Sequence, residues 1–141
     1  MKLYINGIDA NITYGITLDP TGLSALMTPP GMKENVKNTS RLEHGTRVIT
    51  AHPHMAARQL SLAINLVARD PQQFHTRYAA FCQVLAGGFL DIHTTAQPGI
   101  EYHLEYNSCS QFSQYHQGIA KFMLKLTEND PSDRTPRHRY T

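Results

Sequence analysis

The histidines come closest, by type and spacing, to forming a reactive site. The sequence has 141 residues, and eight of them are histidine. His52 and His54 flank a proline, while His93 and His103 fall in segments with a strand pattern. Adjacent strands can present several ligands on one face, so these four could hold zinc in a small metal-dependent enzyme or ligand-binding β-barrel. No carboxylate or cysteine stands at a companion spacing, so no metal ligand is predicted.

Candidate nucleophiles are present without the surroundings that would activate them. Ser108, Cys109 and Ser110 are consecutive, and His103 and His116 lie near them in the sequence. No strand–turn–helix elbow with flanking glycines encloses these residues. A hydroxyl or thiol without an oriented base is a weak nucleophile, so no catalytic residue is predicted in this stretch.

Two carboxylates and a glycine pair have plain structural explanations. Glu101 and Glu105 fall on the outward side of an alternating strand pattern, where charges are ordinarily solvated. Gly87-Gly88 follows a helix pattern instead of opening one, which is the wrong polarity for a phosphate site. We therefore predict no enzyme, no small-molecule substrate and no cofactor.

Composition and charge limit the possible partners. The formal net charge is +2, and three of the thirteen basic residues lie near the C-terminus: Arg134, Arg137 and Arg139. The rest of the chain is close to neutral, so we do not expect sequence-specific nucleic-acid binding. No apolar run approaches the length of a membrane span and no secretory signal is recognisable, which favours the cytoplasm. Cys82 and Cys109, predicted to be free thiols, suit that compartment.

The segment from residue 59 to 95 predicts a strand, a helix and a second strand. Leu60, Leu62, Ile64 and Leu66 alternate with polar or small residues, which is typical of a half-buried strand. Asp70-Pro71 supplies an N-cap and a first-turn proline, so we expect a helix over about residues 70–86. Its stripe of Phe74, Tyr78, Phe81 and Leu85 predicts packing against a core. Gly87-Gly88 ends the helix, and residues 89–94 read as a strand.

The other elements define the expected fold class. Strands are predicted at residues 2–6, 12–18, 100–106 and 118–127, with Gly15 as a bulge, and residues 107–117 as irregular or a short edge strand. Residues 19–46 are predicted to form a long loop. We expect an α+β, mainly β domain over residues 1–128: a β-sandwich or partly closed barrel of six to eight strands with one packed helix. Residues 129–141 are predicted to be a disordered tail.

The order of these elements resembles the tail-tube fold of bacteriophage tail proteins. The segments that carry the resemblance are Ile5-Asn6-Gly7, a long polar loop ending in Glu43-His44-Gly45-Thr46-Arg47, the strand from Arg58, the helix ending at Gly87-Gly88 and the closing strand at residues 120–127. The nearest likeness is to the N-terminal domain of distal tail proteins, at the junction of tube and baseplate. The resemblance implies a structural protein of a phage or prophage tail, six copies of which close into a ring.

That resemblance implies partners and a place of action. The partners would be other copies of the chain and other tail or baseplate proteins, in the bacterial cytoplasm during assembly and then in the virion tail. A long polar loop can cover the sheet edge of a neighbour. We therefore expect subunit contacts at the charged residues of the loop and its return: Lys33, Lys37, Arg41, Glu43 and Arg47. A monomeric adaptor that binds one protein partner remains the alternative from another class.

Overall fold

A computed structural model describes residues 1–32, 37–38, 47–48 and 55–140. The N-terminal elements, in chain order, are β1 (Leu3–Ile5), β2 (Ile8–Asp9), α1 (Ala10–Tyr14), β3 (Ile16–Leu18), α2 (Gly22–Met27), β4 (Lys37–Asn38) and β5 (Arg47–Val48). They are followed by β6 (Arg58–Val67), α3 (Pro71–Ala86), β7 (Phe89–Thr94), β8 (Tyr102–His116) and β9 (Ile119–Glu128).

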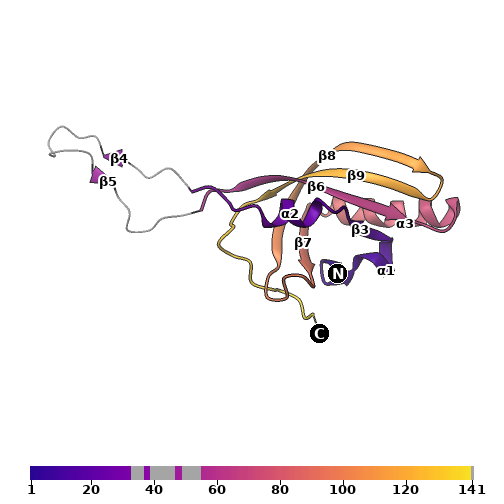
Figure 1. The fold of residues 1–141 in the computed structure, drawn as a ribbon, viewed down its shortest axis with the longest axis horizontal. Helices are drawn as coiled ribbons and strands as arrows, with labels where there is room; N and C mark the ends of the chain where they lie inside the picture. Colours follow the sequence, from indigo (N-terminus) through magenta and orange to yellow (C-terminus); the bar gives the residue numbers. More distant parts are fainter. Residues whose placement is uncertain (33–36, 39–46, 49–54, 141) are drawn as a thin grey trace.

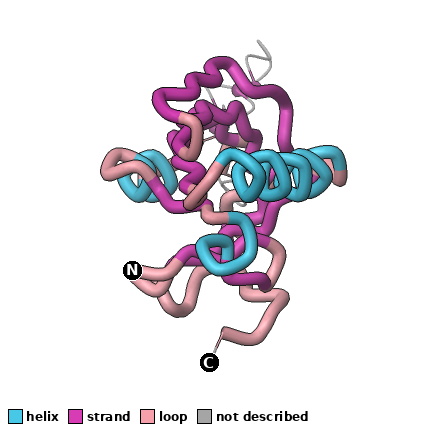
Figure 2. The backbone as a smooth tube through the Cα atoms, turned by 90° about the vertical axis from the view of Figure 1, so that its right-hand side faces the viewer, coloured by secondary structure: helices cyan, strands magenta, loops and turns pink. Residues whose placement is uncertain are grey.

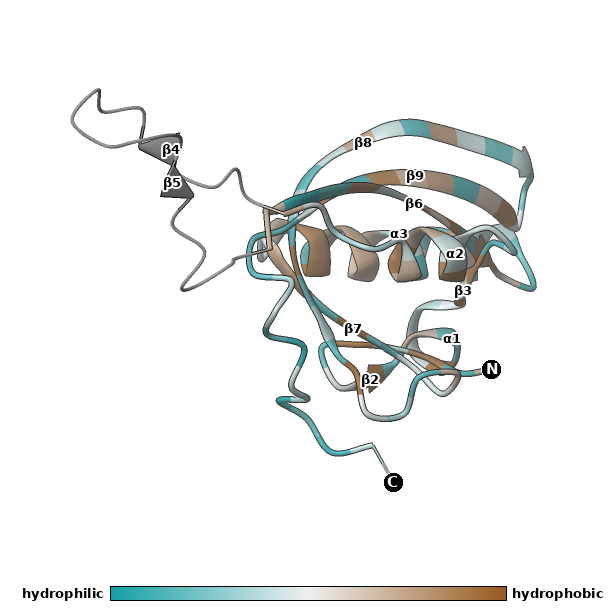
Figure 3. Cartoon of the chain, turned by 60° about the vertical axis from the view of Figure 1, so that its left-hand side comes forward, coloured by the Kyte–Doolittle hydropathy of each residue, from teal (hydrophilic) through white to brown (hydrophobic). Residues whose placement is uncertain are grey.

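Seven of these strands form one antiparallel sheet in the order β2-β1-β7-β8-β9-β6-β3. The sheet curves around α3, with β6, β8 and β9 on one side of the helix and β7 and β2 on the other (Figures 1 and 3). The helices lie between the long strands and the terminal segments (Figure 2). The sheet does not close, and β4 and β5 form a separate pair. The expected mainly β fold with one long packed helix is confirmed.

The core lies between the concave face of the sheet and α3. Leu62, Ile64 and Leu66 of β6 are almost completely buried, as their alternation predicts. Strand β9 pairs with β6 over ten residues in unbroken register, from Arg58↔Glu128 to Val67↔Ile119. This pairing places Leu124 and Leu126 beside the β6 side chains, so the two long strands present one continuous apolar face.

Helix α3 begins and ends at the predicted signals. The Asp70 side chain accepts a hydrogen bond of 2.7 Å from the Gln73 amide, and Pro71 occupies the first turn. The Gln73 side-chain oxygen accepts a hydrogen bond of 2.9 Å from the Arg69 amide. Arg69 lies one residue before the cap residue, Asp70. At the other end, Gly88 adopts a φ of 84°, a left-handed conformation that favours glycine.

Asp70→Ala should lower the free energy of unfolding by about 1 kcal/mol, because the Gln73 amide would lose its acceptor. Urea unfolding followed by far-UV circular dichroism measures the change. Asp70→Asn is the matched control, since asparagine caps a helix about as well as aspartate. Equal losses in both variants would contradict a capping role for this side chain.

The structure differs from the sequence predictions at residues 12–15 and in part of the long loop, and it decides between the two alternatives for residues 107–117. Residues 12–14 are helical because the Asp9 carboxylate caps the Asn11 and Ile12 amides, and Gly15 ends the helix at a φ of 67°. Only residues 16–18 of the predicted strand remain as β3. Of the two alternatives for residues 107–117, the edge strand is the one observed, and β8 continues to His116 with three register shifts against β9. Part of the predicted long loop forms α2.

Candidate assembly edge and C-terminal polar network

The outer half of β8 is an open sheet edge. Strand β7 pairs with β8 only at its start, from Phe89↔Glu105 to Ile92↔Tyr102. Strand β9 pairs with β8 along nearly its whole length, as far as His116↔Ile119. Within the described residues, the other side of residues 107–116 therefore has no strand partner, and Figure 1 shows β8 as the outermost long strand.

This edge has few of the features that prevent strands from pairing. Residues 106–117 contain no lysine, arginine, aspartate, glutamate or proline. All of residues 107–116 are exposed except Cys109, including two large rings, Phe112 at 45% and Tyr115 at 69%. The register shifts along β8 are its only local disruption. A long uncharged edge invites another strand, so it suits a defined interface.

The edge on the far side of the sheet is better protected. Strand β3 pairs with only three residues of β6, from Ile16↔Leu66 to Leu18↔Ile64. Beyond them, the Asp19 amide donates to the Ala63 carbonyl at 3.0 Å and α2 lies along β6. The two long strand edges therefore differ in the described part of the chain: residues of β3 and α2 cover β6, whereas no described strand pairs with the outer half of β8.

The predicted subunit contacts fall mostly outside the described residues. Lys37 and Arg47 lie on the short pair β4–β5, in the register Lys37↔Val48 and Asn38↔Arg47. Lys33, Arg41 and Glu43 lie outside the described residues, so the predicted contact surface remains a proposal.

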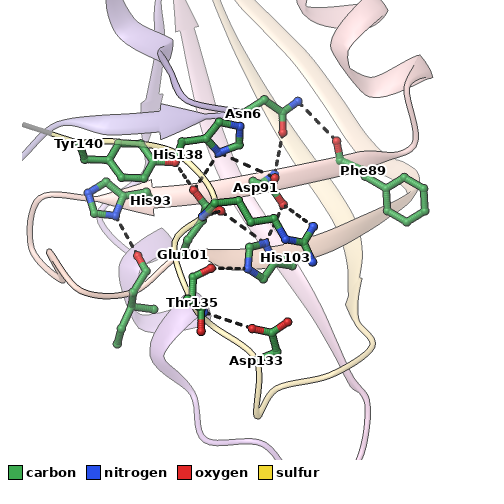
Figure 4. A network of polar contacts seen from close by, with 12 residues as sticks. Asn6, Phe89, Asp91, His93, Glu101, His103, Asp133, Thr135, His138 and Tyr140 are labelled. Atoms are coloured by element: carbon green, nitrogen blue, oxygen red, sulfur yellow. Dashed lines mark hydrogen bonds and ion pairs between the residues drawn. The ribbon is translucent and has the colours of Figure 1, made fainter.

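The C-terminal segment, residues 129–140, follows a defined path along β7 and β8, unlike the disordered tail expected. Its contacts centre on Glu101, which the sequence predicts as a solvated carboxylate but which is fully buried. Glu101 accepts hydrogen bonds from the Arg137 amide at 2.9 Å, from His138 Nδ1 at 3.0 Å and from the Tyr140 hydroxyl (Figure 4). Burial alone would raise the pKa of Glu101, but these three hydrogen bonds together hold it below its usual value.

Tyr140 anchors the end of this segment. Its ring stacks on His93 with centroids 3.8 Å apart, and it also lies against Tyr4 of β1. Burial and the hydrogen bond to Glu101 raise the pKa of the Tyr140 hydroxyl far above its ordinary value. The phenol therefore stays protonated and donates to the carboxylate.

His103 and Asp91 form the second half of the network. His103 Nδ1 lies 2.8 Å from Asp91 Oδ1, and its Nε2 lies 2.9 Å from the Thr135 carbonyl oxygen. The Asp91 amide donates to Asn6 Oδ1 at 2.8 Å, and Arg137 Nη1 lies 3.8 Å from Asp91 Oδ1. These contacts join β7, β8, the turn after β1 and the C-terminal segment.

A buried ion cluster fixes the start of the same segment. Glu128, at the end of β9, accepts two hydrogen bonds from Arg134, at 2.9 and 3.0 Å, and pairs with Arg58 at 3.0 Å. Arg58 also donates to the carbonyl oxygens of Leu26 and Thr28 at 2.8 and 2.7 Å. Glu128 thus joins β9 to β6 and the C-terminal segment, and Arg58 adds the end of α2.

Two of the four histidines weighed from the sequence as a zinc site can be located in the structure, His93 and His103. His52 and His54 lie outside the described residues, and the Nδ1 atom of His93 lies 2.8 Å from the Ile100 carbonyl oxygen. His103 instead gathers with Asp91 and Glu101. Cys82 and Cys109 are free thiols. The Cys109 thiol donates to the Gln111 carbonyl at 3.1 Å.

No protein-family model and no curated protein matches this chain. Among solved structures it matches the crystal structure of the Dit protein of phage SPP1, described as a paradigm of the hub adsorption apparatus in phages that infect Gram-positive bacteria. The TM-score is 0.61 at 16% sequence identity, over 92% of this chain. The fold of this chain is therefore similar to that of the SPP1 Dit protein. This Dit-like fold confirms the resemblance expected from the order of elements.

The match covers only part of the Dit protein. It covers 50% of the Dit chain, so the present chain spans half the length of that protein. No helix in the described part of the chain is long and apolar enough to cross a bilayer.

Proposed function

We propose that this chain is a non-enzymatic structural component of a phage or prophage tail, at or near the junction between the tail tube and the baseplate. The observation that carries the proposal is the Dit-like fold over 92% of the chain. Six copies would close into a ring, formed in the bacterial cytoplasm and then carried in the virion tail. Its partners would be other copies and neighbouring tail or baseplate proteins.

The open edge of β8 supports self-assembly. In a closed ring each copy uses one surface to contact a different surface of the next copy. An exposed strand edge supplies unpaired amides and carbonyls that a neighbouring backbone can satisfy. Residues 107–116 carry no formal charge, so this contact would bury no unpaired ion. We place the main subunit contact there.

The charged residues expected from the sequence complete the proposed interface. Lys33, Lys37, Arg41, Glu43 and Arg47 would contact the neighbouring copy through exposed ion pairs. Such pairs set orientation more than affinity, because exposed ion pairs contribute little to binding. Substituting them should therefore change the geometry of the ring more than it changes whether the ring forms.

Gln111→Lys/Gln114→Lys should weaken self-association by about tenfold or more, because each lysine opposes strand pairing at the β8 edge. Multi-angle light scattering across a concentration series measures the association, and negative-stain electron microscopy shows whether rings form. The wild-type chain should give rings or tubes at high concentration, and the variant should remain mainly monomeric.

Gln72→Lys/Gln83→Lys is the matched control, since both glutamines are exposed on α3 and the change in charge is identical. This variant should associate like the wild type. Equal weakening in both double variants would assign the effect to net charge and contradict the β8 interface. A wild-type chain that stays monomeric at high concentration would contradict ring assembly itself and favour the adaptor alternative.

A further inference from the structure

Four side chains able to bind a metal ion converge where the C-terminal segment crosses β7 and β8. Asp91 lies on β7, Glu101 directly precedes β8, His103 lies on β8 and His138 comes from the segment. One ligand atom each of Asp91, Glu101 and His103 lies within 4.8 Å of the others. His138 Nδ1 lies 3.0 Å from Glu101 Oε2 and 4.0 Å from Asp91 Oδ2. Figure 4 shows the four groups pointing toward one another.

The surroundings of His103 point to a cation. Its Nε2 lies 2.9 Å from the Thr135 carbonyl oxygen, which can only accept, so this nitrogen carries a hydrogen. Its Nδ1 then faces two more acceptors, Asp91 Oδ1 at 2.8 Å and Glu101 Oε1 at 3.6 Å. Either a second proton or a metal ion must lie between them. A ring nitrogen donating to a backbone carbonyl is the usual second contact of a metal-binding histidine.

The spacing and charge of the group fit a divalent ion. Ligand atoms around a tetrahedral zinc ion lie about 3.3 Å apart, given metal–ligand distances of about 2.0 Å. His103 Nδ1 faces Asp91 Oδ1 and Glu101 Oε1 at 2.8 and 3.6 Å. His138 Nδ1 faces the other oxygen of each carboxylate, Glu101 Oε2 at 3.0 Å and Asp91 Oδ2 at 4.0 Å. Two carboxylates would balance the charge of the ion, and Glu101 is fully buried. The hydrogen bonds that Glu101 accepts from the Arg137 amide and Tyr140 would orient its carboxylate toward the ion, as hydrogen bonds to metal-binding side chains commonly do.

The site also has an approach from solvent. A cavity of about 180 Å³ reaches two of the four groups, Asp91 and His103, and its other lining residues include Glu105, Asp133 and Arg137. Its acidic lining favours cations.

We infer that Asp91, Glu101, His103 and His138 form a binding site for a divalent transition-metal ion of the zinc type, which ties the C-terminal segment to the sheet. Two imidazoles and two carboxylates are a ligand set that Zn²⁺ accepts. Binding at the two Nδ1 atoms displaces any proton held there to solvent. The inference does not rest on ring assembly, because all four ligands belong to one chain.

Isothermal titration of the chelator-treated full chain with Zn²⁺ tests the inference. We expect one ion per chain, and native mass spectrometry checks that count. His138→Gln should weaken binding by at least about tenfold, because it removes a ligand while its half-exposed position spares the core. Co²⁺ in place of Zn²⁺ should give the strong visible absorption of a tetrahedral site. Zn²⁺ should also slow tryptic cleavage after Arg137 and Arg139, which flank His138.

Two variants separate this site from the other histidines. His75→Gln, at an exposed position on α3, and His52→Gln/His54→Gln should bind Zn²⁺ like the wild type. His103→Gln should match His138→Gln. Failure of the wild type to bind one Zn²⁺ per chain would overturn the inference. Loss of binding in the His52/His54 variant with none in His138→Gln would overturn it as well.

Discussion

Replacing Glu128 by alanine should lower the free energy of unfolding by about 3–5 kcal/mol, which is the range for removing one partner of a buried ion pair. Glu128 is fully buried and holds Arg58, itself only 7% exposed, at 3.0 Å. Without the carboxylate, the Arg58 guanidinium keeps its carbonyl partners but loses the opposing charge. Far-UV circular dichroism in urea measures the loss, since the chain has no tryptophan.

Glu105→Ala serves as the control, because Glu105 lies on the adjacent strand and its contact with Asn129, at 3.0 Å, is exposed. It should cost less than about 1 kcal/mol. Arg58→Met/Glu128→Ala should be more stable than Glu128→Ala alone, because it removes the unpaired buried cation. A double variant less stable than the single one would show that an unpaired Arg58 is not the source of the loss.

Phe81→Ala should lower the free energy of unfolding by a similar amount, about 3–5 kcal/mol, as expected for a large aromatic side chain removed from a core. The Phe81 ring is fully buried and lies 5.6 Å from Phe122 of β9 and 6.1 Å from Tyr14 of α1, centroid to centroid. Its removal therefore loosens α3 from both the sheet and α1. The same urea experiment measures this change.

Phe89→Ala is the matched control, because the same atoms are removed from a ring that is 66% exposed. Its effect should stay within about 0.5 kcal/mol. A loss in Phe81→Ala as small as in Phe89→Ala would mean that α3 contributes little to the core.

The sequence correctly predicts those helices and strands whose own residue pattern favours the structure that they adopt in the fold. The alternation of residues 59–66 sets the buried face of β6, and Asp70-Pro71 sets the start of α3, because both depend on near neighbours. Residues 12–14 mislead, since their β-branched and aromatic side chains favour a strand, whereas the Asp9 cap and Gly15 favour a helical turn. For the outer half of β8 the sequence leaves an irregular segment and an edge strand both open, and pairing with β9 decides for the strand by holding the polar segment extended.

The C-terminal network could not be predicted for a different reason. Glu101 and His138 are separated by 37 positions, and no motif relates them. The composition of residues 129–140, rich in Asp, Pro, Ser and Arg, is typical of disordered segments. The segment is ordered by its hydrogen bonds to the Glu101 carboxylate, and the same segment covers Glu101. Neither feature can therefore be predicted without the other.

The position of β9 in the sheet has a consequence for biosynthesis. It lies between β6 and β8 and is the last of the described strands in chain order. Until the ribosome has translated through residue 128, β6 pairs with β3 at only three of its ten residues, and the described part of β8 beyond residue 105 has no strand partner on either side. Pairings this distant in the chain form slowly, and unfinished chains with open edges aggregate. A nascent chain therefore gains the half-paired edge of β8 only after residue 128 has been translated, so assembly through that edge cannot precede this point.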